Sequence, residues 1–158
     1  MPEPRFEKQE FRGELRRVHQ GVRSAIYNSD GEILMLYREN EDWDTGWEIV
    51  KGSVDEGETN IEAVEREIDE ETGVDYRIVD KREDPFDALI PKDDEDDVPV
   101  HSWLYVAEYE GGEVEMGEPE HKEYRWMKPS EAKEELWWDD GEDVIDYAEK
   151  VISENLEN

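Results

Sequence analysis

The sequence contains no cysteine. This absence excludes disulfide bonds, thiolate nucleophiles and zinc sites built from cysteine. Long hydrophobic runs are also missing, because the longest purely apolar runs have five residues, as in Ile33–Tyr37, and cannot span a bilayer. Residues 1–11 lack the apolar region of a signal peptide. We therefore expect a soluble, cytoplasmic protein that has no contact with a membrane.

Basic residues are scarce. The 158 residues include 18 Lys and Arg against 48 Asp and Glu, which gives a formal net charge of −30. Such a surface repels phosphates, so neither duplex nucleic acid nor an anionic membrane is expected as a partner. The acids are spread along the whole chain, and only eight of the cations are Lys. Because molar salt shortens the Debye length to about 3 Å, this composition predicts a halophilic protein from a salt-rich cytoplasm.

The aromatic content argues for a folded core despite this charge. Six Trp and seven Tyr are large apolar side chains that a disordered chain rarely carries. A length of 158 residues suits one domain and is too short for two well-cored domains. We therefore expect residues 1–158 to form a single domain.

Hydrophobic periodicity predicts strands interleaved with helices. The expected strands are Gly21–Tyr27, Glu32–Arg38, Val74–Val79, Val98–Tyr109 and Glu123–Met127, and the Asp30-Gly31 pair predicts a hairpin between the first two. The second strand is apolar from Ile33 to Tyr37, which indicates burial on both faces. Helices are expected from an N-cap at Ser130 to Leu136 and around the amphipathic segment Val144–Ile152. The pattern indicates an α/β or α+β sandwich with helices on both sides of the sheet.

Two stretches read as irregular, Glu39–Gly46 and Asp84–Asp97. The second contains Pro85, Pro91 and the acidic run Asp93–Asp97. We interpret that run as a solvated loop, with a cation site as the alternative.

Residues 51–74 carry the most specific pattern in the chain. Thr59 and Glu62 form a capping box that starts a helix, and Gly73 follows its last residue, Thr72. At 100° per residue, the apolar side chains Ile61, Val64 and Ile68 fall on one face, which we expect to be buried on the sheet.

Three carboxylates, Glu67, Glu70 and Glu71, fall on a neighbouring arc of this helix with only Ala63 among them. They repel one another at neutral pH unless something compensates their charge. A hard divalent cation with oxygen ligands, Mg²⁺ or Mn²⁺, is the natural compensation, and the small Ala63 leaves room for it. In a chain this rich in Glu, an ordinary acidic surface is the alternative.

The spacing of residues from Gly52 to Val74 favours a metal site over an ordinary acidic surface. The defined positions are Gly52, Glu58, Arg66, Glu67, Ile68, Glu70, Glu71, Gly73 and Val74. In this order and spacing they resemble the box of Nudix (MutT-like) hydrolases at every defined position. The resemblance implies an α/β/α sandwich with a mixed β-sheet between helices. It also implies hydrolysis of a diphosphate linkage in a nucleoside diphosphate derivative, with Mg²⁺ or Mn²⁺, by a protein that is often a homodimer.

The resemblance also assigns roles within the box. Glu67, Glu70 and Glu71 are expected to bind the metal, with the carbonyl of Gly52 as a further ligand. Arg66 is expected to hold Glu67 in place, and its alternative role is an ion pair with Glu62 or Glu70. Glu58 is expected to brace the junction between loop and helix.

The catalytic set is expected to comprise Glu67, Arg66 and a general base that takes a proton from the attacking water. In this family the base comes from the box or from a Glu outside it. The outside candidates are Glu118, Glu120 and Glu123, and we favour Glu120.

Two further segments resemble diadenosine tetraphosphate hydrolases, namely residues 47–52 and 120–126. Val50 departs from that pattern, because the subgroup usually has Pro there. We expect Lys51 and Arg38 to contact substrate phosphates and Tyr124 to stack on a base. Trp47, Trp103 and Trp126 read as core residues, and His19, His101 and His121 read as ordinary polar positions without ligand spacing.

A dinucleoside polyphosphate is therefore the preferred substrate. ADP-ribose, nucleotide sugars, damaged nucleoside triphosphates and RNA 5′ ends remain as alternatives. An isopentenyl diphosphate isomerase of the same fold relies on a Cys that this chain lacks. A non-catalytic nucleotide-sensing module is disfavoured because such modules generally have an eroded box, whereas every acid is present here.

Overall fold

The computed structural model describes residues 3–39, 45–92, 95–136 and 141–156, and within them it contains nine strands and three helices. The strands are β1 (Phe6–Phe11), β2 (Glu14–Tyr27), β3 (Ile33–Arg38), β4 (Gly46–Glu48), β5 (Val50–Ser53), β6 (Asp75–Lys81), β7 (Phe86–Lys92), β8 (Glu95–Gly111) and β9 (His121–Met127). The helices are α1 (Asn60–Glu71), α2 (Pro129–Glu135) and α3 (Gly141–Leu156). None of these helices is long and apolar enough to cross a membrane.

All described strands belong to one mixed sheet. Its central path is β4-β3-β2-β8-β6, while β1 and β5 pair with β2, β7 pairs with β8, and β9 pairs with β3. β2 runs parallel to β8, with His19 opposite Val100 and Tyr27 opposite Glu108. The other pairs are antiparallel.

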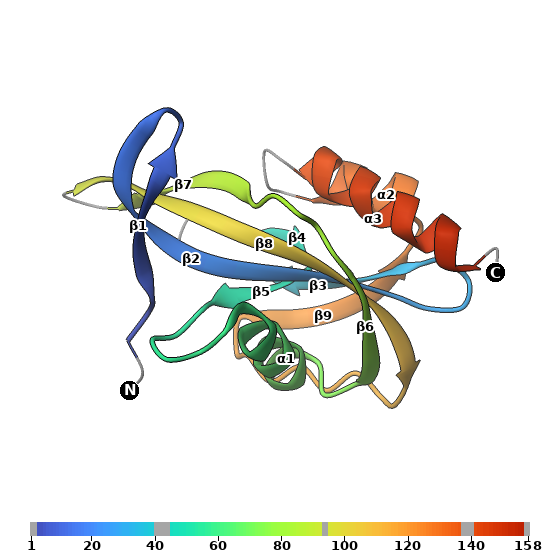
Figure 1. Cartoon of the computed structure of the whole chain (residues 1–158). Coiled ribbons are helices and arrows are strands. Elements are labelled where there is room, and N and C mark those ends of the chain that lie inside the picture. The colour runs from blue at the N-terminus through green and yellow to red at the C-terminus, as the bar shows by residue number, and fades with distance from the viewer. Residues whose placement is uncertain (1–2, 40–44, 93–94, 137–140, 157–158) are drawn as a thin grey trace.

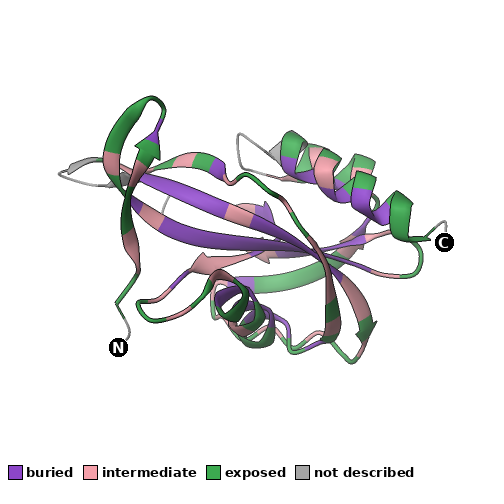
Figure 2. Cartoon of the chain, in the orientation of Figure 1, coloured by how far each residue is buried: buried purple, intermediate pink, exposed green. Residues whose placement is uncertain are grey.

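Helices cover both faces of the sheet, with α1 on one side and α2 and α3 on the other (Figure 1). Alternate residues of the central strands therefore face different helices. In β3, Leu34 packs in the cluster that contains α1, whereas Met35 packs in the cluster that contains α3. The central strands are buried over most of their length (Figure 2). The α/β sandwich with a mixed sheet and the two-sided burial of the second expected strand are both confirmed.

The expected hairpin between β2 and β3 is confirmed at its turn, but the two strands pair only next to that turn. A turn does form, with the amide of Asn28 donating to the carbonyl of Glu32 at 3.0 Å. However, Tyr27 and Ile33 are the only residues that pair across it in the described strands. Beyond this point β2 pairs with β5 and β8, and β3 pairs with β4 and β9, so the two strands separate. This separation sets β3 and β5 apart from one another at the site.

Four of the described strands lie where the sequence indicated none, namely β1, β4, β5 and β7. β7 lies inside the stretch that was expected to be irregular. It pairs with β8 in a register that places Phe86 opposite Ser102 and Lys92 opposite Glu95. Pro91 is tolerated because β7 is an edge strand. The N-terminal residues form β1, which joins β2 through a turn at Arg12-Gly13, where both residues have positive φ. Of the acidic run Asp93–Asp97, the first two residues lie outside the described chain.

The caps of α1 are as predicted. Thr59 and Glu62 form both hydrogen bonds of the capping box, and Gly73 has a φ of 66°. Two expectations for side chains of this helix are wrong. Ile61 is 38% exposed because it lies in the first turn, and Ala63 is fully buried in the core rather than beside an ion.

Of the remaining helix expectations, one needs correction. The N-cap of α2 is Lys128 rather than Ser130, because Pro129 suits the first helical position. The apolar residues of α3, from Val144 to Ile152, are buried as their spacing predicts.

Candidate active site

Arg66 of α1 connects the box loop to the helix. Its Nε donates to Glu58 Oε2 at 2.8 Å, its Nη1 to Glu67 Oε1 at 2.7 Å, and its Nη2 to the carbonyl of Ser53 at 2.9 Å. It also forms the expected i,i+4 ion pair with Glu70, at 3.3 Å. Glu58 in turn accepts from the amide of Asp55 at 2.9 Å. The hydrogen bond from Arg66 lowers the pKa of Glu58, so this brace is ionised at neutral pH.

Gly52 of β5 lies directly against the carboxyl group of Glu67. A Cβ on Gly52 would stand 2.1 Å from Cδ and 2.3 Å and 2.5 Å from the two carboxylate oxygens of Glu67. No side chain fits in this space while Glu67 occupies it. The glycine therefore brings its own backbone against a carboxylate that Arg66 fixes from the other side.

Glu67 and Glu71 are buried on α1, where Arg66 contacts only the first of them closely. Burial raises the pKa of Glu67, although the hydrogen bond from Arg66 acts in the opposite direction. Burial, followed by the nearby Glu67, also raises the pKa of Glu71. Neither carboxylate oxygen of Glu71 has a hydrogen-bond partner among the described residues. A buried acid in this state needs a proton or a cation.

The loop before β9 brings Glu118 to the box. Its carboxylate, with those of Glu67 and Glu70, forms a group whose ligand atoms lie within 4.8 Å of one another. Gly117 allows this approach, because a Cβ there would stand 1.9 Å from the carbonyl oxygen of Glu70. The side chain of Glu120 belongs to neither acidic group found among the described residues, and its carbonyl accepts from the amide of Glu39. The geometry therefore favours Glu118 over the residue that the sequence favoured.

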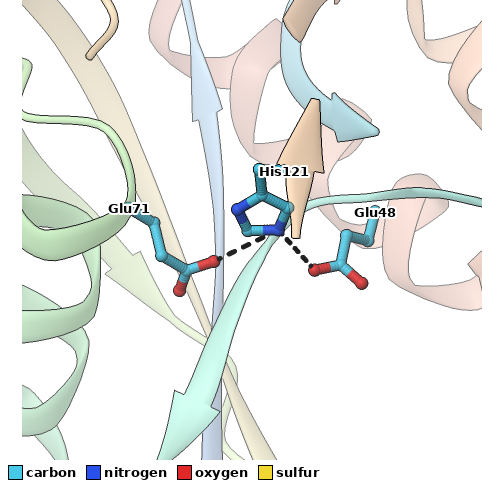
Figure 3. Close-up of side chains that lie close together, drawn as sticks. All are labelled: Glu48, Glu71 and His121. Atoms are coloured by element: carbon cyan, nitrogen blue, oxygen red, sulfur yellow. Dashed lines mark hydrogen bonds and ion pairs between the residues drawn. The ribbon is translucent and has the colours of Figure 1, made fainter. Parts of the chain in front are cut away.

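His121 of β9 lies between two acidic side chains (Figure 3). Its Nε2 is 2.9 Å from Glu48 Oε2 and 3.8 Å from Glu71 Oε1, and the side chains of His121 and Glu48 are fully buried. An ionised carboxylate only accepts hydrogen bonds, so Nε2 carries the proton that is shared with Glu48. The interpretation of His121 as an ordinary polar position is wrong. Spacing within the sequence gave no sign of it, because its partners come from β4 and α1.

Glu48 gathers positive side chains as well as His121. Arg38 Nε donates to its carboxylate at 3.1 Å and 3.2 Å, and Lys51 Nζ lies 3.7 Å away. Burial opposes the ionisation of Glu48, but His121, Lys51 and Arg38 together outweigh it and lower its pKa. This one buried carboxylate thus connects both expected phosphate-binding residues to His121.

A pocket with a cavity volume of about 200 Å³ opens beside these cations. Its described lining comes from β2, β3, β5, β7 and β8: His19, Gly21, Val22, Arg23, Arg38, Lys51, Gly52, Ser53, Ala88, Ile90, Val100 and Ser102. These twelve residues include three cations and no Asp or Glu, in a chain that has 48 acids. Gly52 belongs both to this lining and to the box, so the pocket adjoins the carboxylate cluster.

Arg23 was missed by the sequence reasoning. It is 3% exposed, and its Nε donates to Ser102 Oγ at 2.9 Å. Arg23 is the only charged residue of the expected strand Gly21–Tyr27, which was the available signal, because a buried charge needs a specific partner. In contrast, Tyr124 is 43% exposed on β9 and is not among the described residues of the pocket. Its predicted stacking on a base therefore depends on a different surface.

The residues of the box fit a hard divalent cation. The donor set consists of carboxylate oxygens with a backbone carbonyl at hand, which is the ligand chemistry of Mg²⁺ and Mn²⁺. The buried, partnerless oxygens of Glu71 and the closely packed Gly52 and Glu67 support the same reading. Among the described residues, the groups that could hold the ion are Glu67, Glu70 and Glu118, and Glu71 with Glu48 and His121. The expected ligand set of Glu67, Glu70, Glu71 and the Gly52 carbonyl stays a prediction.

Comparison with known proteins gives the family. A profile of the NUDIX domain matches residues 17–147, which is most of the chain. The chain belongs to the Nudix family. It is thus a Nudix pyrophosphohydrolase, which acts on nucleoside diphosphate derivatives with a divalent metal. The comparison with curated protein sequences gives no match.

Solved structures similar to this Nudix hydrolase share its fold. A MutT protein from Methanosarcina mazei Go1 is 24% identical with a TM-score of 0.68, and the match covers 86% of this chain and 94% of that one. The dihydroneopterin triphosphate pyrophosphohydrolase of E. coli is 23% identical with a TM-score of 0.64, over 81% and 92%. An Ap4A hydrolase of C. elegans is 19% identical with a TM-score of 0.66, over 87% and 97%.

Proposed function

We propose that this Nudix hydrolase cleaves a diphosphate linkage in a dinucleoside polyphosphate. The observation that carries the proposal is the position of the pocket, whose described lining includes Arg23, Arg38 and Lys51 and no acid, and which shares Gly52 with the box. A polyphosphate chain needs several cations in a row in addition to the metal site. The two segments that resemble diadenosine tetraphosphate hydrolases support the same substrate, since they supply Lys51 and His121.

In the proposed reaction, Lys51 and Arg38 bind the phosphates that flank the cleaved bond. Glu48 holds both cations from behind, so their orientation is set before substrate arrives. A divalent cation bound by the box would neutralise the diphosphate oxygens and acidify a water. Glu118 is proposed as the base that takes the proton of the attacking water, because its carboxylate lies beside Glu67 and Glu70. Arg66 keeps Glu67 in place throughout.

A phosphate-release panel tests this proposal. Diadenosine tetraphosphate, ADP-ribose, a nucleotide sugar, an oxidised nucleoside triphosphate and a 5′-triphosphorylated RNA are compared in molar KCl, with Mg²⁺ and with Mn²⁺. We expect the highest kcat/KM for diadenosine tetraphosphate. A higher value for any other compound overturns the substrate assignment. Absence of hydrolysis of every compound, with metal binding intact, would favour a nucleotide-sensing module instead.

A further inference from the structure

The β1–β2 hairpin carries an unusual concentration of positive charge. Residues 5–23 contain six cations, Arg5, Lys8, Arg12, Arg16, Arg17 and Arg23, and three acids, whereas the whole chain has a charge of −30. Among the described residues, no ion pair includes Lys8, Arg12, Arg16 or Arg17. In a chain with an excess of acids, cations without acidic partners leave a surface that is ready for an external anion.

Only one of the two faces of this hairpin is continuous with the lining of the pocket. In the pairing of β1 with β2, Lys8 lies opposite Arg17 and Phe6 lies opposite His19, so these four side chains share one face. Along β2 the alternation continues from Arg17 through His19 to Arg23, and the last two line the pocket. Glu10 and Leu15 follow on the same face toward the turn. Arg16 lies on the opposite face.

The side chains of the pocket-side face are arranged as a stack. The guanidinium of Arg17 lies 3.9 Å from the centroid of the Phe6 ring, and that ring stacks on His19 with 5.1 Å between centroids. Such a stack presents the outer surface of a planar guanidinium, which binds phosphate oxygens and stacks on bases. The strand extends about 20 Å from Arg17 to Arg23, so the positive side chains form an extended path along it and not one compact cluster.

Hydrogen bonds connect the hairpin to the box loop and to β8, although its turn projects beyond the sheet (Figure 1). Arg5, just before β1, donates to the carbonyl of Glu58 and to Asn60 Oδ1, both at 2.8 Å, which connects the hairpin to the box loop and α1. Gln9 Oε1 accepts from Gln20 Nε2 at 2.8 Å and lies 2.7 Å from His101 Nδ1 of β8. The positive face is therefore held in a fixed relation to the pocket.

We propose that the pocket-side face of the hairpin, Phe6, Lys8, Arg17 and His19, binds the nucleotide unit of the substrate that is remote from the cleaved diphosphate. This inference rests on the proposed function. A pocket of about 200 Å³ is smaller than typical ligand pockets, which begin at about 300 Å³, so a compound with two nucleosides extends beyond it. The part of the compound outside the pocket would lie on the cationic, acid-poor path along β2. Lys8 and Arg17 are the outermost cations of this path.

Two adjacent arginines provide a matched test. Arg16 and Arg17 carry the same charge, and each lies over a phenyl ring, Phe11 at 5.9 Å and Phe6 at 3.9 Å, but only Arg17 faces the pocket side. Binding of diadenosine tetraphosphate and of ADP is measured by equilibrium dialysis in molar KCl with EDTA, so that no turnover occurs. We expect Arg17→Gln to weaken binding of the dinucleotide about three- to tenfold, as for the loss of one typical net hydrogen bond, and to leave the affinity for ADP unchanged. Arg16→Gln should change neither affinity, and Arg17→Lys should recover part of the loss.

Three results would overturn the inference: equal effects of the two glutamine variants, an equal effect of Arg17→Gln on ADP, or wild-type protein that binds the dinucleotide no more tightly than ADP. Turnover is scored separately. An Arg17-specific loss of binding without hydrolysis of diadenosine tetraphosphate would refute the proposed function and keep the binding surface. Hydrolysis with equal Arg16 and Arg17 effects would keep the function and refute the surface.

Discussion

Replacing Gly52 with alanine adds one methyl group where the structure has no room. The added Cβ would lie 2.1 Å from Glu67 Cδ, and an ordinary contact begins at 3.4 Å, so the carboxyl group must retreat by about 1.3 Å. That movement disrupts the 2.7 Å hydrogen bond from Arg66. Misplacing a catalytic group by about 1 Å can cost about a hundredfold, so we expect kcat/KM of Gly52→Ala to fall at least that far.

The fold should survive this change, because the Cβ meets the flexible end of a side chain rather than backbone. We expect the free energy of unfolding without metal to change by less than about 1 kcal/mol. The assay is therefore a pair of measurements, kcat/KM on the best substrate and the melting temperature with and without Mn²⁺. The Mn²⁺-induced rise in melting temperature should shrink in the variant, because Glu67 is displaced from the other ligands.

A double variant provides the control. Glu67→Asp shortens the side chain by one methylene and withdraws the carboxyl group from Gly52. Although Glu67→Asp is itself slow, adding Gly52→Ala to it should cost less than about threefold more, because the two residues no longer collide. If the loss of kcat/KM in the double variant equalled the product of the losses in the two single variants, Gly52 would act through something other than Glu67. Turnover of Gly52→Ala close to that of the wild type would refute the packing argument altogether.

Further expectations concern the acids and the salt. Glu70→Gln should lower turnover at least about a hundredfold with the fold intact, because it removes a ligand charge and no core volume; near wild-type rates would remove Glu70 from the metal site. Glu118→Gln should slow the reaction without weakening Mn²⁺ binding, whereas a slower Glu120→Gln would restore the assignment made from sequence. The pKa of Glu71 is raised in the folded protein, so its contribution to metal-free stability is full below the ordinary carboxyl pKa and is lost as the pH rises toward the pKa of the folded state. The rise in melting temperature that Mn²⁺ causes should therefore grow from about pH 6 to about pH 8. A rise that stays constant over this range would contradict the argument. The melting temperature should rise steeply from about 0.1 M to about 2 M KCl, and a flat profile would refute salt adaptation.

The box could be predicted from sequence because its geometry is local. Thr59, Arg66 and Gly73 act within a helix and its caps, where a spacing in the sequence fixes a spacing in space. The contact of Arg66 with Glu70 follows from the same periodicity, whereas its contact with the adjacent Glu67 was expected only from the family resemblance. The two-sided burial of β3 could be predicted as well, because every residue from Ile33 to Leu36 is apolar.

Long-range pairing could not be predicted in the same way. Glu48, Glu71 and His121 come from three elements. The pairing of β3 with β4 and β9 brings Glu48 and His121 together, and the packing of α1 on the sheet adds Glu71. β7 was missed because Pro85, Pro91 and the acidic run suggested a loop, although Phe86, Ala88 and Ile90 already alternate along an edge strand. The position of Glu118 depends on how Gly117 packs against α1, which no periodicity within the sequence records.

A chain with a charge of −30 must still hold a negative substrate, and Glu48 positions two of the cations that would contact it. In molar salt, long-range attraction is screened, so the substrate has to be recognised by contact. Exposed lysines and arginines on such a surface would pair with any of the many surrounding acids. Glu48 instead binds Arg38 and Lys51 from inside the protein, where its side chain is fully buried, and no acid occurs among the described residues that line the pocket. The buried carboxylate thus fixes the direction of both cations beside a pocket whose described lining contains no acid.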